Sequence, residues 1–293
     1  MQAGTKTRTD MPQAVDVDAA DFWELVASRP DPLLAPMLRG YWGYAEQSTG
    51  PVCRHELPIA DIVLIVNLGD ALRLVQPDGQ PLIIDAGQGF IAGLHTSYTI
   101  TETTGSQSGV EVRLSPLGAY RLFRRPMHDL CNRSVDLRDI NATWMNALIR
   151  QLREESDWAA RFAACDATLL ERSAVTQRSS SEVAWAWRQL QRSGGRVAIA
   201  TLCDELGWSP KRLISRFREQ IGLPPKEAAR LIRFQRAAAS ISETAIIDWD
   251  AFAQWHGFFD QSHLIHECRR FAGDTPQRLR QRALGPGSGF VAN

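Results

Sequence analysis

Short stretches of apolar and polar positions, each of strand length, follow one another through the first half of the chain. They lie at residues 62–68, 71–75, 81–94, 98–101 and 109–114. The first is a continuous apolar run, the second and the last alternate with a period of two, and the third is long enough for two strands. About six short strands at this spacing predict a small domain that is either a cupin-like barrel or a sandwich.

The hydrophobic period changes at Ser115 and Pro116. A serine that can cap a helix is followed there by a proline, which suits the first helical turn. Helices are expected over residues 117–125, near 141–152 and over 158–172. The stretch RSAVTQRSSS that follows is small and polar, and we expect a linker within it, at residues 176–181.

Two similar helical pairs occupy the C-terminal part of the chain. The first covers residues 199–220, with a turn at Gly207 and a second helix that opens at Ser209. The second covers residues 249–272, with a turn at Gly257 and a helix that Asp260 opens. A helix of about 16 residues between the pairs spans about 24 Å. This length is of the order needed to set two reader helices in major grooves about 34 Å apart on one face of DNA.

The two pairs contain the stretches LGWSPKRLISRFREQIGLPPKEAARLIRF and HGFFDQSHLIHECRRFAGDTP. With them the last hundred residues resemble the AraC/XylS family of bacterial transcription regulators, whose G-[FY]-x-D-Q-x-H-[FL] signature the second stretch matches. Cys203 and Cys268 depart from the family pattern, which usually has Ala and Phe there. We expect Phe259 or Phe271 to fill the volume that the second change leaves.

The resemblance implies a sequence-specific regulator that binds double-stranded DNA through two helix-turn-helix units. The first half of the chain is loosely similar to the sensor or dimerisation regions of such regulators. A small-molecule effector, RNA polymerase and a second copy of the chain are therefore further candidate partners. The operator, the effector and the choice between activation and repression stay open.

Each second helix divides its side chains between two faces. Leu213 and Phe217 in the first, and Leu264, Cys268 and Phe271 in the second, fall in line and are assigned to the core. The opposite faces hold the candidate DNA contacts, which are Lys211, Arg212, Ser215, Arg218, Gln261, Ser262, Ile265, His266, Arg269 and Arg270.

These residue types suit different parts of a duplex. Long cations reach guanine edges or phosphates, glutamine can pair with adenine, and an apolar group such as Ile265 can pack on a thymine methyl. By the resemblance, the N-terminal half of each helix touches bases. The arginines at 218, 269 and 270 are assigned to phosphates, which position a protein without reading sequence.

Other polar and aromatic residues nearby have structural interpretations. We expect Asp260 to be an N-cap and His263 to pack near the turn. Trp208, Trp249 and Trp255 are expected in core or turn packing rather than in base stacking.

Charge is distributed unevenly along the chain, although the formal net charge is zero. Residues 183–283 carry 16 basic and 10 acidic side chains, whereas the remainder carries 17 and 23. A basic half beside an acidic half favours a polyanionic partner. Five cysteines are dispersed without a CxxC pair, and no signal-peptide pattern or membrane-spanning run occurs. These features favour the cytoplasm, with no membrane partner.

An enzyme in the β-rich half is the first alternative. Its histidines His55, His95 and His128 lie far apart in sequence, and no nucleophile or phosphate-binding motif occurs. We therefore expect no catalytic residue, metal or cofactor. A helical module that docks a protein rather than DNA is the second alternative. Side chains that could line an effector pocket, without commitment to any, are Trp42, Arg54, His55, Asn67, Arg73 and His95.

The pattern as a whole predicts a multidomain α+β protein. Its N-terminal domain is β-rich with following helices, and its C-terminal domain is all-α, with two helix-turn-helix units joined by a linker helix. The expected divisions are a mobile tail at 1–20, a sensor or dimerisation domain at 21–175, the linker at 176–181, a DNA-binding domain at 182–284 and a tail at 285–293.

Overall fold

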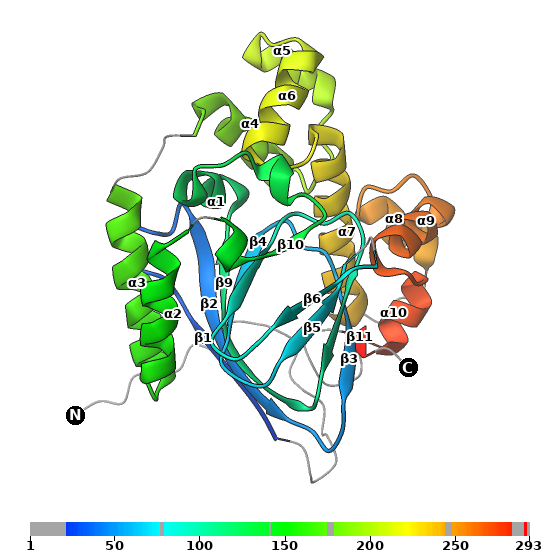
Figure 1. Ribbon diagram of the computed structural model, residues 1–293. Helices are drawn as coiled ribbons and strands as arrows, with labels where there is room; N and C mark the ends of the chain where they lie inside the picture. The colour runs from blue at the N-terminus through cyan, green and yellow to red at the C-terminus, as the bar shows by residue number, and fades with distance from the viewer. Residues whose placement is uncertain are drawn as a thin grey trace, which may run out of the picture.

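A β-sandwich and a helical domain pack against each other in the computed structural model, which describes residues 22–76, 79–140, 142–174, 179–243, 248–282 and 290–291. Helices α2 and α3 flank the sandwich on one side, α8, α9 and α10 lie on the opposite side, and α5 and α6 project from one end (Figure 1). The described fold is therefore an N-terminal sandwich followed by a helix-turn-helix domain, as predicted.

The strands form two antiparallel sheets. They are β1 (Phe22–Ser28), β2 (Leu38–Gln47), β3 (Val52–Glu56), β4 (Ile62–Asn67), β5 (Leu72–Val75), β6 (Pro81–Ile84), β7 (Gly89–Ala92), β8 (Thr99–Thr103), β9 (Ser106–Leu114), β10 (Ser134–Asp136) and β11 (Phe290–Val291). The first sheet has the order β1-β2-β9-β4-β7-β10, and the second has the order β11-β3-β8-β5-β6. Two separate sheets make this domain a sandwich rather than a closed barrel.

The helices follow the strands and fill the C-terminal half. They are α1 (Pro116–Phe123), α2 (Trp144–Glu154), α3 (Trp158–Ala174), α4 (Ser181–Arg192), α5 (Ile199–Leu206), α6 (Pro210–Gln220), α7 (Pro225–Glu243), α8 (Trp249–Trp255), α9 (Gln261–Ala272) and α10 (Pro276–Arg282), with 3-10 turns η1 (Met127–Leu130) and η2 (Leu137–Ile140). The predicted units at 199–220 and 249–272 correspond to α5–α6 and α8–α9.

The expected ends and linker match the structure only in part. The tail at 1–20 and residues 176–178 of the linker lie outside the described residues. Ser181, the last expected linker residue, already begins α4. The expected tail at 285–293 contains β11, which pairs antiparallel with β3. Backbone pairing between chain ends far apart in sequence leaves no local signal, so the sequence alone did not predict it.

The first sheet has an apolar face and a polar face because successive side chains of a strand alternate. Tyr41, Leu64 and Val112 are buried on the face that the helices cover, and Tyr41 stacks on Phe162 of α3 with ring centroids 5.9 Å apart. Trp42, which pairs in register with Glu111, turns to the other face, toward the second sheet. The space between the two sheets is therefore lined by polar as well as apolar groups.

Local capping fixes the ends of both reader helices. The Ser209 Oγ accepts a hydrogen bond from the backbone N–H of Arg212 at 3.3 Å, and the Asp260 Oδ1 accepts one from His263 at 2.7 Å. Gly273 ends α9 in the left-handed region, with φ of 72°, which glycine adopts without steric cost. The capping roles predicted for Ser209 and Asp260 are confirmed.

The N-terminal domain, through helix α1 and the sandwich, contacts both helix-turn-helix units and the helix between them. The Tyr120 hydroxyl of α1 donates to Glu219 of α6 at 3.2 Å, and Gln235 of α7 accepts from the backbone N–H of Ala60 at 2.9 Å. At the end of α9, a Cβ on Gly273 would lie 2.5 Å from the ring of Tyr98. The N-terminal domain is thus seated on α6, α7 and the end of α9 at once.

Candidate nucleic-acid interface and inner cavity

Helix α6 presents an open polar face on the side opposite its buried residues. Leu213 and Phe217 are fully buried, which confirms their assignment to the core. The predicted contacts on this helix are all exposed, namely Lys211, Arg212, Ser215 and Arg218. The guanidinium of Arg212 lies 4.3 Å from the ring centroid of Trp208, so this aromatic side chain orients one of the cations.

Ile214 is a member of this face that the sequence analysis missed. Its side chain is 40% exposed, although it is large and apolar. It follows Lys211 by three positions and precedes Arg218 by four, so the three side chains line one side of α6. The sequence signal that could have identified Ile214 is an apolar residue placed between two cations at helical spacing.

Helix α9 has the same two-sided arrangement. Leu264, Cys268 and Phe271 are fully buried, as predicted. The predicted contacts Gln261, Ser262, His266 and Arg269 are exposed, and Ile265 is half-buried.

Phe271 stacks on Phe234 of α7, with ring centroids 4.8 Å apart, beside the small side chain of Cys268. Of the two residues expected to fill that space, Phe259 does not do so, because its side chain is 84% exposed. Phe259 precedes the N-cap and points away from the helix pair, an orientation that only the turn geometry decides.

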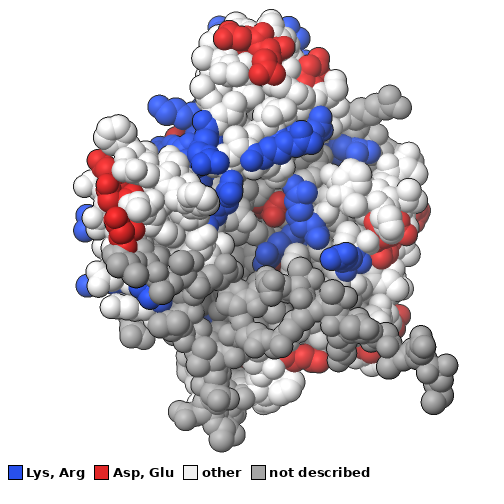
Figure 2. Space-filling view, turned by 180° about the vertical axis from the view of Figure 1, so that it is seen from behind, with Lys and Arg blue, Asp and Glu red and all other residues white. Residues whose placement is uncertain are grey.

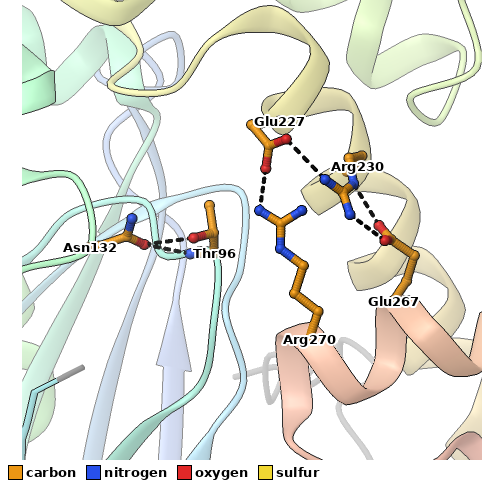
Figure 3. A network of polar contacts seen from close by, with 6 residues as sticks. All are labelled: Thr96, Asn132, Glu227, Arg230, Glu267 and Arg270. Carbon is orange, nitrogen blue, oxygen red and sulfur yellow. Dashed lines mark hydrogen bonds and ion pairs between the residues drawn. The ribbon is translucent and has the colours of Figure 1, made fainter. Parts of the chain in front are cut away.

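Arg270, a predicted phosphate contact, is engaged inside the protein. Its Nη2 lies 2.6 Å from the Oε2 of Glu227 on α7. Arg230 joins the same network, donating to Glu227 at 3.0 Å and to Glu267 on α9 at 2.9 and 2.5 Å (Figure 3). The position of Arg270 therefore supports a role in joining α7 to α9 rather than one in contacting DNA.

Glu267 is the buried member of this network, with 1% of its side chain exposed. Burial alone would raise the pKa of Glu267, but the hydrogen bonds and the charge of Arg230 hold it below its ordinary value. Glu267 is therefore an ionised, paired group that fixes the angle between the linker helix and the second reader helix. Figure 3 also includes the neighbouring pair on the sandwich side, in which the Asn132 Oδ1 accepts from the Thr96 N–H at 2.7 Å.

The structural roles expected near the second turn are met in part. The His263 Nδ1 accepts from the backbone N–H of Phe259 at 3.2 Å, and its ring lies edge-on to Phe258. Trp208 is buried as expected, but Trp255 is 79% exposed, so its expected packing role is wrong. Trp255 lies on the last turn of the short helix α8, whose fully buried residue is Ala253.

Basic side chains gather on the face of the molecule that Figure 2 shows. Seen from behind, Lys and Arg form a band across the middle, below the projecting helices α5 and α6, whereas Asp and Glu lie mainly at the tip of this projection and near the edges (Figure 2).

A cavity of about 430 Å³ lies between the two sheets and is closed on one side by α7. Its volume is within the range of small-molecule sites. Three of the side chains considered for a pocket line it, which are Trp42, Arg54 and His95. The others are engaged elsewhere: His55 stacks on Tyr98, the Asn67 amide donates to the Ile84 carbonyl, and Arg73 pairs with Glu102.

Most charged side chains around the cavity form ion pairs, but one carboxylate does not. Arg54 pairs with Glu46, and Arg113 pairs with Glu111. Glu56 accepts a hydrogen bond from the Thr101 hydroxyl at 2.9 Å but forms no ion pair with any described residue. Burial raises the pKa of Glu56, and the Thr101 hydrogen bond and the charge of Arg54 act in the opposite direction.

His95 is a second polar group of the cavity wall. Burial lowers its pKa to about 4, so the imidazole is neutral at pH 7. An interaction with the backbone of Arg133 acts in the opposite direction.

Among the described residues, no three His, Cys, Asp or Glu side chains are grouped so that they could hold a metal ion. In the same residues, no helix combines the length and the apolar character that crossing a bilayer requires.

Two family models match the chain. A model described as a helix-turn-helix domain matches residues 202–282, and a domain of unknown function, DUF6597, matches residues 27–136. No curated protein matches the sequence.

Solved structures give weaker likenesses. An apo ToxT variant from Vibrio cholerae strain SCE256 aligns with a TM-score of 0.46 and 11% identity over 92% of this chain and 99% of its own. ToxT from Vibrio cholerae O395, bound to (E)-4-(8-methylnaphthalen-1-yl)but-3-enoic acid, gives 0.49 and 11% over 90% and 99%. The AraC-like transcriptional activator CuxR gives 0.33 and 17% over 78% and 85%.

The matched helix-turn-helix domain, with its two capped and exposed reader helices, defines the protein as a DNA-binding transcription regulator. Residues 202–282 form a helix-turn-helix domain of the AraC type, as the two signature stretches indicated. A domain of this type is that of a transcription factor and not of an enzyme family.

Proposed function

We propose that α6 and α9 enter successive major grooves on one face of a DNA duplex. Both helices present an exposed polar face, and both are capped in the same way. Helix α7 between the two units has 19 residues and spans about 28 Å at 1.5 Å per residue. With the offsets of the reader helices added, that length suits the repeat of about 34 Å. The duplicated exposed face is the observation that carries the proposal.

The proposed base contacts are the exposed or half-buried side chains of the open face nearest the start of each reader helix. They are Lys211, Arg212, Ile214 and Ser215 on α6, and Gln261, Ser262, Ile265 and His266 on α9. Arg218 and Arg269 are the proposed phosphate contacts, while Arg270 is left to its ion pair with Glu227.

Footprinting on a selected genomic site tests this arrangement. The protein should protect two major-groove segments whose centres are about 10 base pairs apart on one face. Binding should weaken steeply as salt rises, because several phosphates are contacted. Protection of a single groove, or binding that salt does not affect, would contradict the proposal.

We further infer that the chain divides into a sensor domain at 21–175 and a DNA-binding domain at 182–284, and that a small effector in the inner cavity controls the latter. Phe234, Gln235, Ala238 and Ala239 of α7 form part of the cavity wall. A molecule in the cavity would therefore touch the helix that joins the two readers. A second copy of the chain and RNA polymerase remain predicted partners.

A cavity-filling variant tests the control. Ala238→Leu places a larger side chain on α7 at the cavity wall, and it should shift DNA affinity in the absence of any effector. Ala200→Leu, on the exposed side of α5, is the matched control and should leave affinity unchanged. Equal affinities for the two variants and the wild type would argue against control through α7.

A further inference from the structure

The interior of the sandwich is more polar than folding alone requires. Side chains from both sheets point into it, and these include the carboxylates of Glu56 and Glu111 and the guanidinium groups of Arg54 and Arg113. Buried charges cost free energy unless they are paired, and an apolar interior would be at least as stable. A charged lining around an open volume therefore points to a ligand.

The two arginines of the lining are not available for an anionic ligand. Arg54 is held by Glu46, and Arg113 is held by Glu111 while its guanidinium lies 4.3 Å from the ring centroid of Trp42. An anion would have to break one of these pairs and leave a buried carboxylate without its partner. Removing one partner of a buried pair is strongly unfavourable.

Glu56 is the lining carboxylate that forms no direct ion pair with a described residue, although the charges of Arg54 and Arg113 act on it. It lies on β3 in register with Thr99 of β8, and both side chains face the cavity. Its hydrogen bond from Thr101 satisfies one oxygen atom only in part, since a carboxylate can accept about four hydrogen bonds. A cationic group at this point would give Glu56 an ion pair of its own.

One part of the cavity wall is apolar. Leu72, Leu74 and Phe90 belong to a separate small core cluster, against which Ile65 and Ala92 pack, and all five contribute to the cavity wall. A ligand that fills the volume must therefore combine an apolar body with a polar head.

We propose that the inner cavity binds a small molecule with an apolar body and a protonated amine, and that Glu56 recognises the amine. This inference rests on the proposed role of the cavity as the effector site, and it adds the chemical class of the effector. The neutral imidazole of His95 is a second hydrogen-bonding group within the same wall. Glu56 then determines the sign of the charge that the site accepts.

Calorimetry on the full chain with three matched probes tests the proposal. The probes 4-phenylbutylamine, 4-phenylbutanol and 4-phenylbutyrate share one apolar body and differ in the head group. The amine should bind about tenfold or more tightly than the alcohol, and the carboxylate should bind most weakly.

Variants then identify the group responsible. Glu56→Gln should abolish the preference for the amine and leave the alcohol unaffected. Glu102→Gln is the control, because Glu102 pairs with Arg73 on the outer face of the same sheet, and it should behave as the wild type. Ala92→Phe fills the apolar part while Glu56 is retained, and it should abolish binding of both the amine and the alcohol.

Several results would overturn the proposal. These are equal or tighter binding of the carboxylate, unchanged amine preference in Glu56→Gln, unchanged binding in Ala92→Phe, or no binding of any probe. If circular dichroism shows that Glu56→Gln does not fold, the probe series on the wild type and the binding measurements on Ala92→Phe still test the proposal. DNA affinity of the ligand-free protein is measured separately, so a failure of DNA binding is distinguished from a failure of ligand recognition.

Discussion

Arg230 on the linker helix donates two hydrogen bonds to Glu267 on the second reader helix, at 2.9 and 2.5 Å. The carboxylate is almost fully buried, and Arg230 also pairs with Glu227 on its own helix. The orientation of α9 relative to α7 therefore depends on one buried charged contact as well as on the stacking of Phe271 on Phe234.

Glu267→Gln should destabilise the protein by about 3–5 kcal/mol, because it leaves the Arg230 guanidinium without its buried partner. Unfolding in urea measures the change. The control is Arg216→Ala, which removes a largely exposed ion pair with Glu219 and should cost no more than about 1 kcal/mol. Similar losses in the two variants would contradict the importance of the buried pair.

The same contact predicts how stability depends on pH. The pKa of Glu267 is lowered in the folded protein. Its stabilising contribution is therefore complete above the ordinary glutamate pKa of about 4.3 and is lost as the pH falls through the lowered pKa. Urea unfolding of the wild type and Glu267→Gln between about pH 3 and pH 7 should give curves that converge at the acid end. Parallel curves would mean that Glu267 is not ionised in the folded state.

Gly273→Ala should cost more stability than Gly207→Ala. Both glycines have positive φ, 72° and 62°, so both substitutions carry the strain of a left-handed alanine, about 1 kcal/mol. Only at Gly273 would the new Cβ meet another group, the ring of Tyr98 in the sandwich, since the space at Gly207 is open.

Tyr98→Ala combined with Gly273→Ala should recover the additional loss, which a double-mutant cycle in urea unfolding measures. Additive losses would show that Tyr98 does not limit the space at the end of α9.

Lys211→Ala and Arg269→Ala should weaken DNA binding in different ways. Removal of the proposed base contact should relax the preference at particular base pairs, whereas removal of the proposed phosphate contact should weaken all sequences alike and reduce the salt slope by about 1. Binding to a panel of single-base operator variants at several salt concentrations separates the two effects. If both variants weaken all sequences equally, the assignment of the two faces is incorrect.

Asp260→Ala should cost about 1 kcal/mol of stability, whereas Asp260→Asn should cost less, because asparagine retains the capping oxygen. The Asp260 Oδ1 accepts from the His263 N–H at 2.7 Å. Thermal unfolding of the two variants provides the measurement. Equal losses would indicate that the negative charge, not the cap, is what matters at this position.

The sequence by itself determined the helical half of the protein. The caps at Ser209 and Asp260, the glycine turns and the stripe of Leu264, Cys268 and Phe271 are local patterns, and local patterns encode helices through contacts three and four residues apart. The open faces of α6 and α9 followed from the same periodicity. Domain order and the basic character of the C-terminal half were also accessible from sequence.

Tertiary structure decided the features that depend on distant partners. Strands β1, β2 and β3 were not predicted. In β2, Tyr41 faces the helices and Trp42 faces the cavity, so polar and apolar residues do not alternate simply along this strand. Only the packing of the two sheets face to face brought Glu56 of β3 into a shared cavity with the paired Arg113 of β9. Only the packing of α9 on α7 turned Arg270 toward Glu227 and away from the open face. The periodicity of a single element says which side chains share a face, but the partner that meets that face is set by contacts across the whole fold.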